Sequence, residues 1–311
     1  MSEMLQVSPL QNGFLAPLLS TELLVDMAYA MEQYHNFLAD IALLKAGAEY
    51  KDLGLATRRE MQAPQIVYMA ADHSNLVMDR WRLHTDHPDY KPKPGAVALL
   101  KLSGIMRSES AASTQGVDVL ERDLRQAFAT PEISAVILDI NSGGGEAMAG
   151  FRLRSVIAEK NKPVLAYVHY AASAAYLAAT AATEIIAAHR GARIGSIGAL
   201  ISIDKVALQE YTDNYLEIYA EQSTHKNAGL RAAKGGDFSL VQKSVNRLAG
   251  DFIGIVKGAR DLTGDEQTIT ETLSGKVFNA GEAKQRGLTD LTGNFNAVWD
   301  RAKTWAQRKT F

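Results

Sequence analysis

The sequence contains no cysteine. This absence excludes disulfide bonds, thiol nucleophiles and zinc sites built on cysteine. The net charge is also small, −2 at pH 7 over 311 residues, so no overall basic field points to nucleic acid or to anionic lipid. We therefore expect no nucleic-acid partner, and we expect neither a metal nor a cofactor.

Long apolar runs are missing as well. The most apolar stretch, residues 164–182, is rich in alanine and is interrupted by polar and aromatic side chains. A membrane span needs about 20 predominantly apolar residues, so this stretch is expected to be a buried strand and helix. The N-terminal residues lack the basic and apolar regions of a signal peptide. We expect a cytoplasmic protein without a membrane anchor.

The first third of the chain is predicted to be a helical segment followed by a linker, residues 1–94. Residues 20–46 have the spacing of one long helix, which either packs on its own domain or forms an oligomer or docking contact. Residues 84–95 are polar and rich in proline, as in linkers, and nothing near His84 and His87 completes a metal site. The apolar seam of the helix consists of Leu24, Met27, Met31, Tyr34, Leu38 and Ile41.

Residues 95–311 are predicted to form one α/β domain. Apolar segments of strand length alternate with segments of helical period, which is typical of a largely parallel sheet with flanking helices. The expected strands are 97–104, 135–140, 164–170, 184–189, 196–200 and 216–221. The expected helices are 116–129, 146–160, 173–182, 237–262 and 280–287.

Three features could carry chemistry. Residues 141–145, Asn-Ser-Gly-Gly-Gly, follow a buried strand and open a helix, where backbone N–H groups can bind an anion or an oxyanion. Ser173 lies between a strand and a helix, at the sheet edge where α/β sites form. Lys226 could serve as a base if burial favours its neutral form. Each has an ordinary alternative: a tight turn, a helix cap and a surface lysine.

In combination these segments resemble the signal peptide peptidase A family of serine proteases, within the Clp-protease/crotonase superfamily. The resemblance covers roughly residues 96–300. The matching segments are DINSGGGEAMAG (139–150), AASAAYLAA (171–179), RIGSIGAL (193–200), THKNAG (224–229) and SGKVFNAGEAKQRGLTD (274–290).

The resemblance implies a fold and a set of roles. The fold would be Clp-protease/crotonase-like. Ser173 would be the nucleophile and Lys226 the general base, with oxyanion donors from Gly144, Gly145 and the Ala174 amide. Related members can build one site from two neighbouring protomers, so a homo-oligomer acting on a protein or peptide is implied.

Departures from the family pattern narrow the expected role. The usual Ser-Pro-Gly-Gly is Ser-Gly-Gly-Gly at 142–145, and Ala174 and Ala175 replace the usual glycines after the nucleophile. The Ser-Ala-Ala-Tyr form looks like phage and prophage head-maturation proteases, which would place the protein in the host cytoplasm or the procapsid and give it capsid or scaffold substrates.

Four alternatives stay open. A peptidase that degrades signal peptides or membrane peptides would use the same dyad. A crotonase-type CoA enzyme would use the same glycine loop without the dyad. A non-catalytic scaffold protein would keep only the fold. Histidine-based catalysis, as in Clp proteases, is disfavoured because neither His169 nor His189 matches the expected position, and His225 would point elsewhere from an extended segment.

Overall fold

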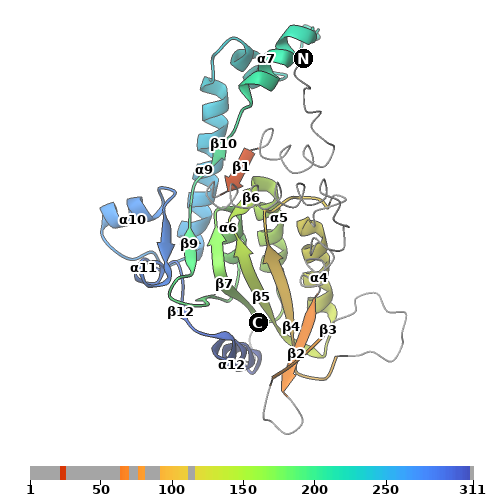
Figure 1. Cartoon of the computed structure of the whole chain (residues 1–311), viewed down its shortest axis with the longest axis vertical. Coiled ribbons are helices and arrows are strands. Elements are labelled where there is room, and N and C mark those ends of the chain that lie inside the picture. The colour runs from red at the N-terminus through yellow and green to blue at the C-terminus, as the bar shows by residue number, and fades with distance from the viewer. Residues whose placement is uncertain (1–21, 26–63, 70–75, 81–91, 111–115, 309–311) are drawn as a thin grey trace, which may run out of the picture.

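The computed structural model describes residues 22–25, 64–69, 76–80, 92–110 and 116–308 (Figure 1). Their main feature is a nine-stranded sheet with the order β11-β9-β7-β5-β4-β2-β3, in which β8 pairs with β7 and β12 pairs with β8. Its strands are β2 (Gln65–Met69), β3 (Leu76–Arg80), β4 (Ala96–Ser103), β5 (Ile133–Ser142), β7 (Val164–Ala172), β8 (Glu184–Ala187), β9 (Arg193–Gly195), β11 (Val277–Asn279) and β12 (Leu291–Thr292).

The centre of this sheet is parallel. β4, β5 and β7 pair in parallel. The other edge of β7 pairs in parallel with two short strands, β8 along its first half and β9 along its last residues. β2, β3 and β11 add antiparallel strands at the two edges. The central strands are apolar along their length because both faces of a parallel sheet are covered.

Helices form a layer on each face of the sheet. On one face Val136, Leu138 and Ile140 of β5 join a core with α4 (Val117–Ala129), α5 (Ala147–Ala158) and α6 (Ala174–Ala179). On the other face Ala135 and Ile137 pack with α12 (Phe295–Ala306). The alternation of neighbouring residues between the two cores follows from the two-residue period of a strand.

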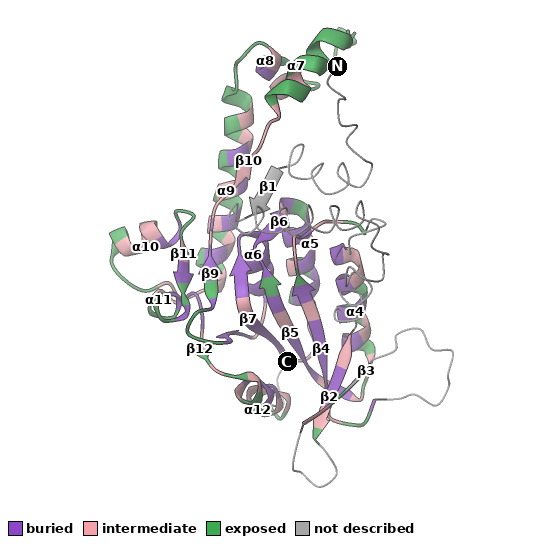
Figure 2. Ribbon diagram, viewed as in Figure 1, coloured by how far each residue is buried: buried purple, intermediate pink, exposed green. Residues whose placement is uncertain are grey.

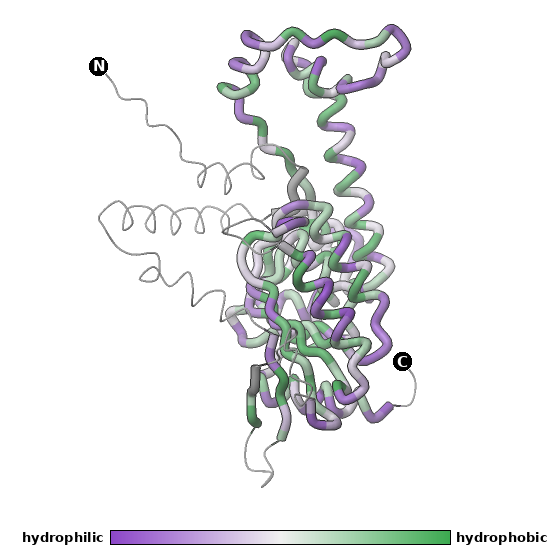
Figure 3. Tube along the Cα trace, turned by 90° about the vertical axis from the view of Figure 1, so that its right-hand side faces the viewer, coloured by the Kyte–Doolittle hydropathy of each residue, from purple (hydrophilic) through white to green (hydrophobic). Residues whose placement is uncertain are grey.

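An arm projects beyond one end of the sheet (Figures 1 and 3). Helix α9 (Ser239–Ala259) buries Phe252 and Val256 against the body, whereas its first half is mostly exposed (Figure 2). The tip carries α7 (Lys205–Asn214), which has no buried residue, and α8 (Ala228–Lys234). The helices α10 (Glu266–Thr272) and α11 (Ala280–Gln285) lie beside β11 near the base of the arm.

A second, three-stranded sheet has the order β10-β1-β6 and is antiparallel. Its strands are β1 (Glu22–Val25), β6 (Gly144–Glu146) and β10 (Leu200–Ile201). The middle strand therefore comes from the N-terminal segment, and the outer two come from the α/β body.

The predicted α/β fold with a largely parallel sheet and flanking helices is confirmed, and the expected helices at 116–129, 146–160, 173–182, 237–262 and 280–287 all occur with slightly different bounds. The helix predicted for 20–46 is wrong at its start, because residues 22–25 form a strand that pairs on both sides. The rest of that helix and of its seam, with His84 and His87, lies outside the described residues.

Two predicted strands are also wrong. Residues 196–200 are not one strand, since Ser196 has a φ of 51° and only Leu200 enters β10. Residues 216–221 form no strand, because none of the described strands lies beside them to pair with. The domain division at residue 94 stays a prediction, although β2 and β3 lie in the same sheet as β4.

Candidate active site

Ser173 lies at a sharp corner between β7 and α6. Its backbone has φ 56° and ψ −122°, a combination that mirrors extended backbone and that only glycine adopts without strain. The residue is 1% exposed. A serine held in this way after a strand and before a helix has the arrangement of a hydrolase nucleophile, although the flanking residues are alanines rather than glycines.

The corner is held in place by the segment around Gly195. The Ser173 N–H donates to the Gly195 carbonyl at 2.8 Å, and Leu177 N–H donates to the Ser173 carbonyl at 2.9 Å. Gly195 itself has a φ of 122°, and a Cβ there would lie 2.6 Å from the carbonyl oxygen of Lys276. Glycine is therefore required at 195, and its carbonyl in turn fixes the backbone of Ser173.

The glycine-rich loop forms β6, which lies beside the start of α6 (Figure 1). Gly144 has a φ of 94° and its carbonyl accepts from Met106 N–H at 2.8 Å. A Cβ on Gly145 would collide with the Met106 backbone. These constraints explain two of the three glycines: one needs a left-handed backbone and the other allows a close backbone approach.

The predicted oxyanion donors differ in their surroundings. The Gly144 N–H donates to the Ser142 hydroxyl at 3.1 Å, and that hydroxyl donates to the Gly104 carbonyl at 2.6 Å. Ala174 is the first residue of α6, so its N–H is among those that the helix itself does not use. It lies close to Gly150 of α5, where a Cβ would be 3.0 Å from the Cβ of Ala174. Small residues thus bring α5 against the start of α6.

Lys226 lies far from this corner within one chain. It lies two residues before α8, a helix at the tip of the arm and apart from α6 (Figure 2), and Lys226 is exposed. A single chain therefore does not bring the predicted nucleophile and the predicted base together.

The histidines lie elsewhere. His169 Nε2 is 3.4 Å from Asp139 Oδ1, and its ring contacts the rings of Tyr167 and His189. Tyr167 belongs to the core on the α12 face, whereas α6 packs on the opposite face. Burial raises the pKa of the Asp139 carboxyl, an effect that His169 opposes. Among the described residues, no group of three or more His, Asp or Glu side chains is placed to hold a metal ion.

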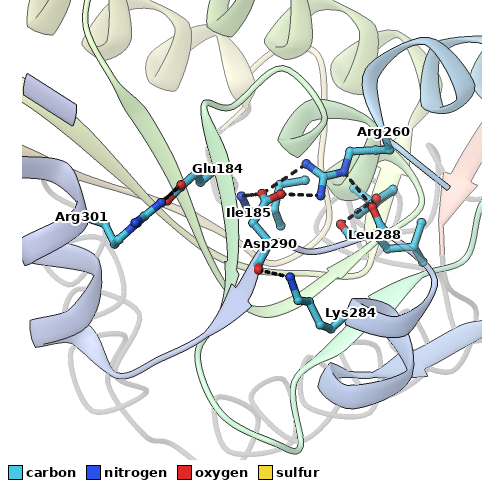
Figure 4. Close-up of polar contacts among 9 residues, drawn as sticks. Glu184, Ile185, Arg260, Lys284, Leu288, Asp290 and Arg301 are labelled. Atoms are coloured by element: carbon cyan, nitrogen blue, oxygen red, sulfur yellow. Dashed lines mark hydrogen bonds and ion pairs between the residues drawn. The ribbon is translucent and has the colours of Figure 1, made fainter. Parts of the chain in front are cut away.

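A polar cluster joins β8, the end of α9 and the segment 284–290 (Figure 4). Asp290 accepts from Arg260 at 2.8 and 3.2 Å and from the Ile185 N–H at 2.6 Å. The fully buried Tyr176 of α6 donates to the Leu288 carbonyl at 2.9 Å, and burial raises its pKa above the ordinary range. Since Arg260 follows the last residue of the arm helix α9, this cluster ties the arm, α6 and β8 to one another.

The chain is similar to several known proteins. The family model of peptidase family S49 matches residues 157–309. Protease 4 of Salmonella typhi is 28% identical over 224 residues, which is 69% of this chain and 35% of that protein. The head-tail preconnector protein GP5 of Enterobacteria phage P21 is 38% identical over 198 residues, which is 58% of this chain and 39% of that protein. The chain thus spans little more than a third of either relative.

A solved structure of a membrane-bound stomatin-specific protease overlaps 68% of this chain and 85% of its own, at 19% identity and a TM-score of 0.44. Fold and site together define an α/β protein in which a strained serine corner lies beside a glycine-rich strand. Over residues 157–309 the chain is similar to peptidase family S49, the signal peptide peptidase A type. Within the described residues, no helix has both the length and the apolar character that crossing a membrane demands.

Two parts of the site were not predicted from the sequence. The hydrogen bonds of Met106 with Gly144 and Glu146 join segments about 40 residues apart, so no local sequence pattern predicts them. The insertion of β1 beside that loop was hidden by the apolar spacing of residues 24–41, which is equally typical of a helix.

Proposed function

We propose that the protein is a serine endopeptidase with a Ser/Lys dyad, in which Ser173 is the nucleophile and Lys226 the general base. The observation that carries this proposal is the strained backbone of Ser173 beside the glycine loop. Strain of this kind costs of order 1–3 kcal/mol and persists where the surrounding structure enforces it, which is common at active sites.

The proposed reaction is acyl transfer through Ser173. Its Oγ attacks the scissile carbonyl carbon while its proton passes to the neutral lysine amine. The Gly145 and Ala174 amides are the proposed donors to the oxyanion, and Gly144 joins them only if its N–H leaves Ser142. The lysine then protonates the departing amine, and water releases the acyl group by the same steps in reverse.

The exposure of Lys226 supports a site shared between chains. A lysine acts as a general base only in its neutral form, and the ordinary pKa of a lysine is about 10.4. Burial disfavours the charged ammonium, so a catalytic lysine needs surroundings that exclude water. Because Lys226 is exposed in the single chain, a second chain would have to cover it.

The arm also has apolar side chains that a second chain could cover. Leu216 and Ile218 are 90% and 91% exposed, whereas Glu217 between them and Tyr219 after them are partly buried. Glu217 pairs with Lys234 at 2.6 Å, and Tyr219 lies under Arg231. This alternation places the polar side chains inward and the apolar ones outward, as in a segment that packs on a partner. We propose a homo-oligomer in which the arm of one chain reaches the serine corner of the next.

The proposed substrates are capsid or scaffold proteins during phage head maturation. This part of the proposal rests on the Ser-Ala-Ala-Tyr form at 173–176 and on the likeness to a phage head-tail preconnector protein. It is tested by incubating the purified protein with the capsid and scaffold proteins encoded beside it and identifying the products by mass spectrometry. Intact substrates after prolonged incubation would refute this role.

The nucleophile is tested separately with a fluorophosphonate probe, which reacts with activated serines. The adduct is expected on Ser173 and is expected to disappear in Ser173→Ala. A matched control is Ser155→Ala, which removes an exposed hydroxyl on α5 and should leave labelling unchanged. Labelling that persists in Ser173→Ala would remove Ser173 from the mechanism.

A further inference from the structure

Strand β1 lies in the middle of the small sheet at the candidate active site. Leu23, Leu24 and Val25 pair with Glu146, Gly145 and Gly144 of β6, and Glu22 and Leu23 pair with Ile201 and Leu200 of β10. Both ladders are antiparallel, so a four-residue extended segment bridges two strands that do not pair with each other.

The two outer strands belong to the site. β6 contains both glycines of the oxyanion loop, and β10 follows the Gly-Ser-Ile-Gly segment whose first glycine holds Ser173. β1 also lies against α6, the helix that Ser173 begins, and against α5. The segment therefore runs past the serine corner at the level of the glycine loop.

The position that β1 fills between β6 and β10 can accept any extended peptide, because the contacts there are made by the backbone. β6 has three residues and β10 has two, and within the described chain β10 pairs only with β1. Without β1, both strands would present unpaired backbone N–H and C=O groups toward the same gap. Such edges bind extended peptides through the main chain, which is the physics of strand addition.

We propose that Glu22–Val25 is a built-in occupant of the substrate-strand position, and that a peptide substrate must displace it. The proposal rests on the proposed function for the identity of the site. It implies that substrates bind as extended, unfolded segments that replace β1 between β6 and β10. Because the occupant is tethered, it competes at a high effective concentration, and the apparent affinity for free peptide is reduced by the fraction of molecules in which the gap is open.

The test uses full-length protein carrying Ser173→Ala, so that bound peptide is not consumed. The probe is a fluorescent peptide with the sequence of residues 19–28, and its binding is followed by anisotropy. Successive N–H groups of a strand point to opposite sides. Leu23→Pro and Leu24→Pro therefore each remove a donor, one toward each neighbouring strand.

Each proline is expected to tighten the apparent affinity for the probe about fivefold, the effect of losing one net backbone hydrogen bond from the competing strand. The two together should tighten it about 25-fold. A matched control, Leu23→Val with Leu24→Val, keeps both donors and should bind like the parent. Equal affinity in the control and the double-proline protein, or no binding to either, would overturn the proposal.

A second variant guards against misfolding of the proline proteins. Leu23→Gly with Leu24→Gly keeps every backbone donor but weakens the strand, so it should also tighten probe binding, and unchanged binding would count against displacement. Because the binding measurement needs no hydrolysis, it is independent of the proposed reaction. Absence of peptidase activity in the parent enzyme would refute the proposed function and leave this result standing.

Discussion

Mixing two inactive variants tests whether one site is built from two chains. Ser173→Ala removes the proposed nucleophile, a loss typically on the order of 10⁶ in rate, and Lys226→Ala removes the proposed base. If each site takes its serine from one chain and its lysine from the next, half of the serine positions and half of the lysine positions are intact in an equimolar mixture. In a closed ring with random exchange, about one quarter of the wild-type activity should return.

The reciprocal mixture makes the result decisive. A chain carrying both substitutions is mixed with an equal amount of wild type. A shared site should then keep about one quarter of the activity, because an intact serine must meet an intact neighbour, whereas a site within one chain should keep about one half. Cleavage of a fluorogenic peptide gives the activity, and native mass spectrometry verifies the exchange of chains.

A matched control is Lys205→Ala, which removes another exposed lysine of the arm. This variant should be active alone, and an equal mixture with Lys226→Ala should have no more than the activity that the Lys205→Ala chains contribute. No recovery from the two single variants after verified exchange, together with half activity in the reciprocal mixture, would refute the shared site. It would also mean that the arm folds back within its own chain to deliver Lys226.

Three further outcomes follow from the geometry. Lys226→Arg should be inactive, because a guanidinium cannot give up its proton, and an active Lys226→Arg protein would exclude Lys226 as the general base. Wild-type activity should rise with pH, since the lysine must be neutral, and should fall on dilution, since the site needs two chains. Ser173→Gly should be more stable than Ser173→Ala by about 1–2 kcal/mol in chemical denaturation, since glycine relieves the backbone strain, and equal stability would argue against strain. Gly145→Ala should destabilise the fold by about 1–3 kcal/mol in chemical denaturation, because the added Cβ collides with the Met106 backbone. The turnover number of the same variant should also fall.

Protonation of the partly buried Asp139 carboxyl should also be measurable as a change in stability with pH. Burial raises the pKa of Asp139, so the folded state holds this proton more tightly than the unfolded state. The stability this provides is present at low pH and is lost as pH rises through the raised pKa. Asp139→Asn should therefore have a higher thermal midpoint than wild type at neutral pH, with the difference shrinking as pH falls. A difference independent of pH would show that ionisation is not the cause.

The local patterns of the sequence determined the body of the fold. The apolar runs that became β4, β5 and β7 are buried on both faces, and helical spacing located α4 and α9 close to their observed bounds. These predictions succeed because strand and helix periods depend only on which side chains meet the core. The sequence also placed Ser173 between a strand and a helix, which is where the structure has it.

The tertiary structure decided everything that depends on contacts between distant segments. The corner at Ser173 is held by its hydrogen bond to Gly195, and α5 packs closely against the start of α6. No local pattern of the sequence contains either contact. The apolar segment 216–221 had strand character, but none of the described strands lies beside it. Residues 22–25 had helical spacing, yet they form a strand because two open edges lie beside them. A strand needs a partner for its backbone hydrogen bonds, and only the folded chain supplies or withholds that partner.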